Sequence, residues 1–155
     1  LFMALREEKG FTYGAYSYFD GQKSYGTFNA SAAVRTDATL ESVQLFKDIM
    51  LQYRAGVPQE YVDFTKGSLL KMNALRFETI DAKLGMLNTM TFYGLPMDYV
   101  KQEEDYLRGL TVEQVNETVQ KYIDPMRMYY VVVGDAATQM KGLVNAGLGD
   151  PIQVK

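Results

Sequence analysis

The sequence has 155 residues, enough for one domain that buries about 70% of the surface its unfolded chain would expose. Its 16 basic and 19 acidic residues give a net charge of −3, so the composition does not indicate a basic surface for nucleic acid. No apolar stretch approaches the length of about 20 residues that is needed to span a bilayer. The sequence has no histidine and no cysteine, which excludes Ser-His and Cys-His nucleophiles and the imidazole or thiolate ligands of catalytic zinc. We therefore expect no catalytic metal site in this chain.

The first residues predict a change from helix to strand. Residues 1–9 have the character of the last turns of a helix, and Gly10 follows as a left-handed cap. The aromatic run over residues 11–19 lacks helical spacing and predicts a strand. Asp20-Gly21 is a strong signal for a hairpin turn, and a second strand is expected over residues 24–34.

Apolar residues at helical spacing predict a series of helices after the hairpin. Pro58 suits the first position of a helix, and Thr111 with Gln114 forms a capping box at the start of another, which Pro125 closes. The expected helices cover residues 40–53, 58–76, 79–93 and 97–107, and a further stretch between Thr111 and Pro125.

The C-terminal part predicts a return to the sheet. Residues 126–133 are apolar on both faces, which is typical of a buried central strand. A short helix is expected after Gly134-Asp135, and a last strand over residues 152–154. This order predicts an α+β fold, a two-layer sandwich in which helices cover one face of a mixed or antiparallel sheet. We expect residues 1–155 to form one domain.

Arg6 and Tyr13 are the candidate functional residues. Arg6 lies in the last turn of the first helix, and Tyr13 lies near the start of the first strand, so the reversal at Gly10 brings both near one place. A guanidinium is a fixed fork of donors for carbonyl or carboxylate oxygens. A tyrosine hydroxyl is a neutral donor that stabilises a developing oxyanion. The pair predicts a site that holds a peptide and its transition state, although neither residue activates water.

The stretch Leu-Arg-Glu-Glu-Lys-Gly-Phe-Thr-Tyr-Gly-Ala-Tyr-Ser, from Leu5, resembles the C-terminal-domain signature of the pitrilysin/insulinase-type zinc peptidases. That family includes the mitochondrial processing peptidases and bacterial envelope zinc proteases. Further similar motifs follow in the same order, so the resemblance covers nearly the whole chain. They are Gly56-Val57-Pro58-Gln59-Glu60, Tyr93-Gly94-Leu95-Pro96, Leu110-Thr111-Val112-Glu113-Gln114-Val115 and Val131-Val132-Val133-Gly134-Asp135.

The resemblance implies that this chain is the C-terminal, substrate-gripping lobe of a larger zinc metalloendopeptidase and is inactive alone. In the family a homologous domain or subunit carries Zn²⁺ in a His-x-x-Glu-His motif, which this chain lacks. Arg6 would hold a peptide carbonyl, and Tyr13 would donate to the tetrahedral oxyanion. The expected partners are that zinc-binding domain or subunit and a peptide substrate. The expected location is the bacterial periplasm or cell envelope, with the mitochondrial matrix as the alternative.

Other interpretations remain open at this stage. An arginine at a helix end commonly interacts with the helix dipole or forms a surface ion pair. A strand tyrosine such as Tyr13 commonly packs in the core. For the whole protein, the alternatives are a catalytically inactive homologue that serves as a scaffold or assembly subunit, and a module that binds peptides without cutting them.

Overall fold

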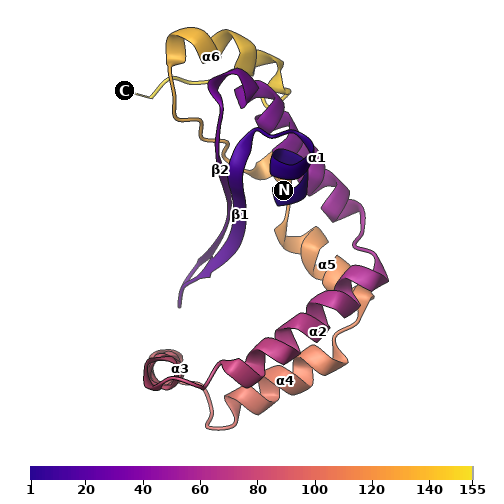
Figure 1. Cartoon of the computed structure of the whole chain (residues 1–155), viewed down its shortest axis with the longest axis vertical. Coiled ribbons are helices and arrows are strands. Elements are labelled where there is room, and N and C mark those ends of the chain that lie inside the picture. The colour runs from indigo at the N-terminus through magenta and orange to yellow at the C-terminus, as the bar shows by residue number, and fades with distance from the viewer. Residues whose placement is uncertain (155) are drawn as a thin grey trace. The chain divides into compact units, whose positions relative to one another are not determined.

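The computed structural model describes residues 1–154, apart from the side chain of Ala74, and divides into two compact units (Figure 1). The first unit comprises residues 1–55 and the chain from residue 120 onward, and the second comprises residues 56–119. Within the described residues, the strands form one two-stranded antiparallel sheet, and helices make up most of the rest. The predicted α+β class is confirmed.

The sheet is a hairpin of β1 (Thr12–Gly21) and β2 (Gly26–Val34). The prediction that Asp20-Gly21 makes the turn is wrong, because Gly21 pairs with Gly26 and the Gln22 N–H donates to the Tyr25 carbonyl at 2.8 Å. A turn at residues 20–21 would place Phe19 opposite Gln22. The observed register instead sets Phe19 opposite Phe28 with ring centroids 5.1 Å apart, a cross-strand aromatic pair that favours this pairing.

The helix α1 (Thr39–Ala55) follows a short 3₁₀ turn over Thr36–Ala38. Its Met50 is buried together with Leu5, Ala15 and Ile123. The Arg54 guanidinium donates to the carbonyls of Gln120 and Ile123 at 2.6 Å each, which fixes the end of α1 to the chain entering this unit from α5. The unit also contains a 3₁₀ turn over Pro125–Arg127, α6 (Ala136–Leu143) and a 3₁₀ turn over Val144–Ala146.

The two strands predicted for the C-terminal part are not formed. Residues 126–127 belong to the 3₁₀ turn that begins at Pro125, and residues 128–133 form no ladder, although Met128 has the extended angles φ −97° and ψ 153°. A strand exists only where a neighbour completes its hydrogen bonds, and β2 pairs with β1 alone among the described residues. Residues 152–154 are likewise irregular.

The second unit is helical, and its helices agree with the sequence. They are α2 (Gln59–Leu75), α3 (Ile80–Tyr93), α4 (Tyr99–Gly109) and most of α5 (Val112–Tyr122). Thr111 and Gln114 form the predicted capping box. The Thr111 N–H donates to Gln114 Oε1 at 3.0 Å, and the Gln114 N–H donates to Thr111 Oγ1 at 3.3 Å. α4 begins two residues later than predicted, because a turn closed by the Tyr99 N–H and the Pro96 carbonyl precedes it.

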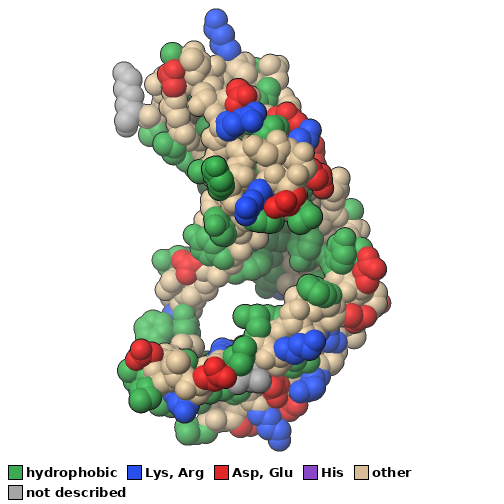
Figure 2. Space-filling view, in the orientation of Figure 1, with side chains coloured by type: hydrophobic (Ala, Val, Ile, Leu, Met, Phe, Trp, Pro, Cys, Tyr) green, Lys and Arg blue, Asp and Glu red, His purple; other side chains and the backbone are tan. Residues whose placement is uncertain are grey.

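Apolar side chains remain on the surface of the second unit (Figure 2). On α3 the exposed fractions are 82% for Ile80 and 54% for Leu84, whereas Met86 and Met90 are buried. Figure 2 shows charged side chains interspersed with hydrophobic ones on the surface. Over the part of the chain that the structure describes, no helix combines the length and the apolar character needed to cross a membrane.

Candidate functional site

The candidate site begins where the first helix is tied to the first strand. This helix is a π-helix over Met3–Glu8, and its Leu5 side chain is fully buried. The Leu5 carbonyl accepts from the Phe11 N–H at 2.8 Å, and the Arg6 carbonyl accepts from the Gly10 N–H at 3.0 Å. Gly10 has φ +63°, so the predicted left-handed cap is confirmed. The end of the helix and the start of β1 therefore lie together, as the sequence predicts.

A β-bulge follows at once in β1. Thr12 pairs with Val34 and Ala15 pairs with Ala32, so three steps along β1 oppose two along β2. The Thr12 hydroxyl holds the bulge: it donates to the Ala33 carbonyl at 2.7 Å and accepts from the Gly14 N–H at 3.1 Å. The extra residue shifts the alternation of side chains between the two faces of the sheet.

The bulge places Tyr13 on the exposed face of the hairpin. Thr12 and Ala15 share the face that buries Ala15, so Tyr13 lies on the opposite face with Tyr16 and Tyr18. A strand without a bulge would put residue 13 on the face of residue 15. The exposed fractions of Tyr13, Tyr16 and Tyr18 are 93%, 68% and 56%. We call these three residues the tyrosine face. The interpretation of Tyr13 as a core residue is wrong.

Gly14 leaves room for the Tyr16 side chain, which is 68% exposed. A Cβ added at Gly14 would lie 2.7 Å from the Tyr16 hydroxyl oxygen, closer than any ordinary contact. The Tyr16 ring therefore covers the bulge from the exposed side. A glycine inside a strand pattern is a known sign of a bulge, and it is the one signal in the sequence that could have assigned Tyr16 and Tyr18 to the candidate site.

Arg6 lies at the helix end with its side chain 45% exposed. Its guanidinium carbon stands 5.0 Å from the centre of the Phe2 ring, and its Nε lies 3.6 Å from a Glu7 carboxylate oxygen. Among the described residues no hydrogen bond or ion pair joins Arg6 to Tyr13. The structure thus brings the two residues onto adjoining segments without a direct contact between them.

Charge at the helix end is balanced by an ion pair. Lys9 Nζ lies 2.7 Å from a Glu41 carboxylate oxygen on the first turn of α1. The hydrogen bond and the negative charge of Glu41 raise the pKa of Lys9 above its usual 10.5, so Lys9 stays charged at neutral pH. An exposed pair of this kind adds little to stability, but it links the helix end to α1.

The residues of this chain do not fit a zinc site. The sequence contains no histidine or cysteine, and within the described residues no three carboxylates gather closely enough to hold a metal ion. The candidate site offers hydroxyl groups, aromatic rings, the Arg6 guanidinium and the exposed Glu7 carboxylate beside it. Groups of this kind can donate hydrogen bonds to main-chain carbonyls and pack against side chains.

Comparison with known proteins identifies the relatives of this chain. Residues 1–69 match the family model described as the peptidase M16 inactive domain. A crystal structure of a peptidase M16 inactive domain from Pseudomonas fluorescens matches 79% of this chain with a TM-score of 0.72 and 28% identity. The resemblance derived from the sequence is therefore confirmed, and the part matched is the domain described as inactive.

A protein from Helicobacter pylori named "Non-peptidase homolog YmxG" is 21% identical over 132 residues, or 84% of this chain. The chain spans about three tenths of each relative, 31% of the Helicobacter protein and 29% of the Pseudomonas chain. These relatives support a resemblance to peptidase M16 domains, but they do not support hydrolase activity.

Proposed function

Because its first 69 residues match a peptidase M16 inactive domain, we propose that this lobe binds extended polypeptide on the tyrosine face and does not cleave it. The observation that carries the proposal is the bulge, which gathers Tyr13, Tyr16 and Tyr18 on one exposed face. The lobe would act as a non-catalytic binding and assembly part of a longer protein.

The chemistry of the tyrosine face suits this role. Tyrosine presents a large apolar ring and a hydroxyl at low conformational cost, so it binds many sequences through rings and main-chain groups. Nothing in such a contact requires a metal or a base. The name of the Helicobacter pylori relative describes that protein as a non-peptidase. By similarity, it favours binding over cleavage for the present chain as well.

A second candidate is the substrate-gripping lobe of an active zinc peptidase. Its support is the tie between the helix end and β1, which sets Arg6 and Tyr13 on adjoining segments while Tyr13 stays 93% exposed. Arg6 would hold a peptide carbonyl, and the Tyr13 hydroxyl would donate to the oxyanion. Zinc and the general base would come from a homologous domain or subunit.

A binding measurement tests the first proposal. Fluorescence anisotropy of a labelled, unstructured peptide is followed as the chain is added, for the wild type, Tyr13→Ala and Tyr53→Ala. Tyr53 is 47% exposed on α1 of the same unit, so it is the matched control. We expect Tyr13→Ala to raise Kd about tenfold and Tyr53→Ala to leave it unchanged. Equal Kd values for the three proteins would contradict the proposal.

A further inference from the structure

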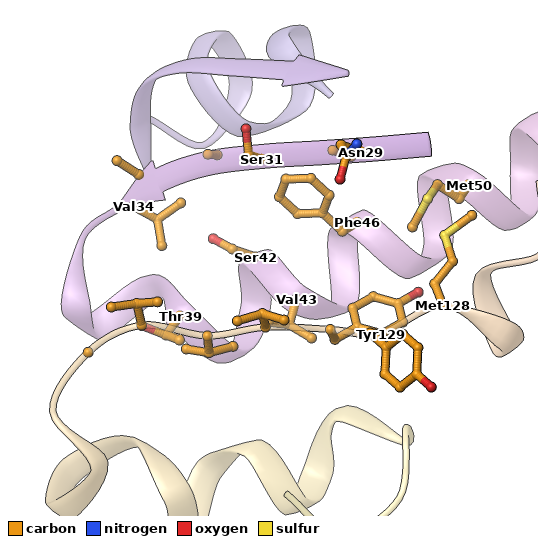
Figure 3. Close-up of a pocket in the computed structure, with 18 of the residues that line it drawn as sticks. Asn29, Ser31, Val34, Thr39, Ser42, Val43, Phe46, Met50, Met128 and Tyr129 are labelled. Carbon is orange, nitrogen blue, oxygen red and sulfur yellow. The ribbon is translucent and has the colours of Figure 1, made fainter. Parts of the chain in front are cut away.

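A groove opens in the first unit between β2, α1 and the extended segment 128–133 (Figure 3). Its volume is about 890 Å³, within the range of sites that hold a ligand of substantial size. Ser42, Val43 and Phe46 of α1 lie along its floor, between β2 and the extended segment. All of these elements belong to one compact unit.

Both walls of the groove present unpaired main-chain groups. β2 pairs with β1 on one edge, and no other described strand occupies its second edge. On the opposite wall, no main-chain hydrogen bond is formed by residues 128–133 within the described structure. The Tyr130 hydroxyl nevertheless donates to the Pro125 carbonyl at 3.0 Å, so this wall is anchored to its own unit. If β2 and residues 128–133 were adjacent strands, they would lie about 4.8 Å apart and share a hydrogen-bond ladder. No such ladder joins them in the described structure.

The floor contains a polar group without a partner. Ser42 is 3% exposed, lines the groove, and its hydroxyl has no hydrogen-bond partner among the described residues. A buried hydroxyl normally finds a partner, because leaving it unpaired costs free energy. A main-chain carbonyl or N–H within the groove would supply that partner.

The lining selects an uncharged occupant. Asp135 is the one formally charged side chain among the described residues of the lining, and its carboxylate already caps α6 by accepting from the Ala137 N–H at 3.0 Å. The rest of the lining is apolar, aromatic or a neutral polar group. A charged occupant would lose its hydration here without gaining an opposite charge.

We infer that one uncharged, extended segment of the same longer polypeptide, from outside residues 1–155, inserts between β2 and residues 128–133. The segment bonds to both walls and to Ser42, and it completes a continuous sheet over α1. This inference rests on the proposed organisation as a lobe of a longer protein. We assign the segment to the same polypeptide because the relatives are about three times as long as the region they share with this chain. A linked segment also binds at high effective concentration.

Overlapping synthetic peptides that cover the remaining polypeptide encoded by the same gene test the inference. Each peptide is added to residues 1–155, and amide hydrogen exchange is measured for β2 and for residues 128–133. We expect one uncharged peptide to slow exchange in both segments at least tenfold, and the longer protein to show the same protection without added peptide. If no peptide slows exchange, or if protection follows the concentration of the chain itself through a second copy, the inference is wrong.

Ser42→Ala gives a second test, because its expected effect on stability differs between the free and the occupied groove. Removing an unpaired hydroxyl should leave the Tm of the free chain unchanged or raised, whereas it should weaken the bound peptide about three- to tenfold. Ser24→Ala, in the exposed hairpin turn, is the matched control and should change neither. If peptide affinity depends on Tyr13 and not on Ser42, the peptide lies on the tyrosine face; the inference then fails while the proposed function stands.

Discussion

Leu5→Ala should destabilise the first unit and detach the helix end from β1. Leu5 is fully buried, so the substitution removes its whole transfer free energy and leaves a cavity beneath the tie to Phe11. Truncating a buried leucine costs about 2–5 kcal/mol. Met3→Ala is the matched control, because Met3 lies on the same π-helix and is 63% exposed. Its expected effect is within about 0.5 kcal/mol.

Urea denaturation gives the free energy of unfolding for the wild type and both variants, and amide hydrogen exchange of Phe11 reports the tie itself. We expect Leu5→Ala to lower the free energy of unfolding by about 2–5 kcal/mol and to speed Phe11 exchange at least tenfold. If Leu5→Ala and Met3→Ala have equal effects on both measurements, then Leu5 does not support the junction that places Arg6 and Tyr13.

Two further predictions concern backbone strain and pH. Gly10→Ala should cost about 1–2 kcal/mol of unfolding free energy in urea, because an L residue is strained at φ +63°; Gly85→Ala, inside α3 with open space around it, should instead gain about 0.5–1 kcal/mol. A backbone N–H and the Thr111 hydroxyl hold the pKa of Glu113 below its usual 4.5. That stabilisation is present above pH 4.5 and is lost as the pH falls through the lower folded pKa. Urea denaturation from neutral to acidic pH should therefore show that the free energy of unfolding falls less on acidification in Glu113→Gln than in the wild type. An equal fall in both proteins would show that Glu113 does not contribute this stabilisation.

Local signals in the sequence predicted the helices well, because each acts within a few residues. The left-handed glycine at residue 10 and the capping box at Thr111 need no distant partner, and both are formed as expected. The hairpin turn was misplaced because its position depends on the cross-strand pair Phe19–Phe28, which outweighs the local preference of Asp20-Gly21. Register is a property of two strands, so one strand's turn signal cannot fix it.

The candidate site was predicted only in part, and for a related reason. The sequence predicted that Arg6 and Tyr13 lie in one region, but it left open a core position for Tyr13. The bulge sets Tyr13 on the exposed face, and the Thr12 hydroxyl bonds to main-chain groups at the bulge. Residues 128–133 have the composition of a central strand, yet a strand also needs neighbours. Within the described chain those neighbours are missing, and the same absence leaves the groove open.

The most direct test of the central claim is peptidase activity of the longer protein, supplied with zinc and any natural partner, on a quenched fluorogenic peptide. Wild type, Tyr13→Phe and the exposed control Tyr53→Phe are compared, with peptide binding measured in the same samples. Our account predicts saturable binding and no cleavage that depends on Tyr13. A fall in kcat of about 10²- to 10³-fold in Tyr13→Phe alone would contradict it and establish this lobe as half of an active site.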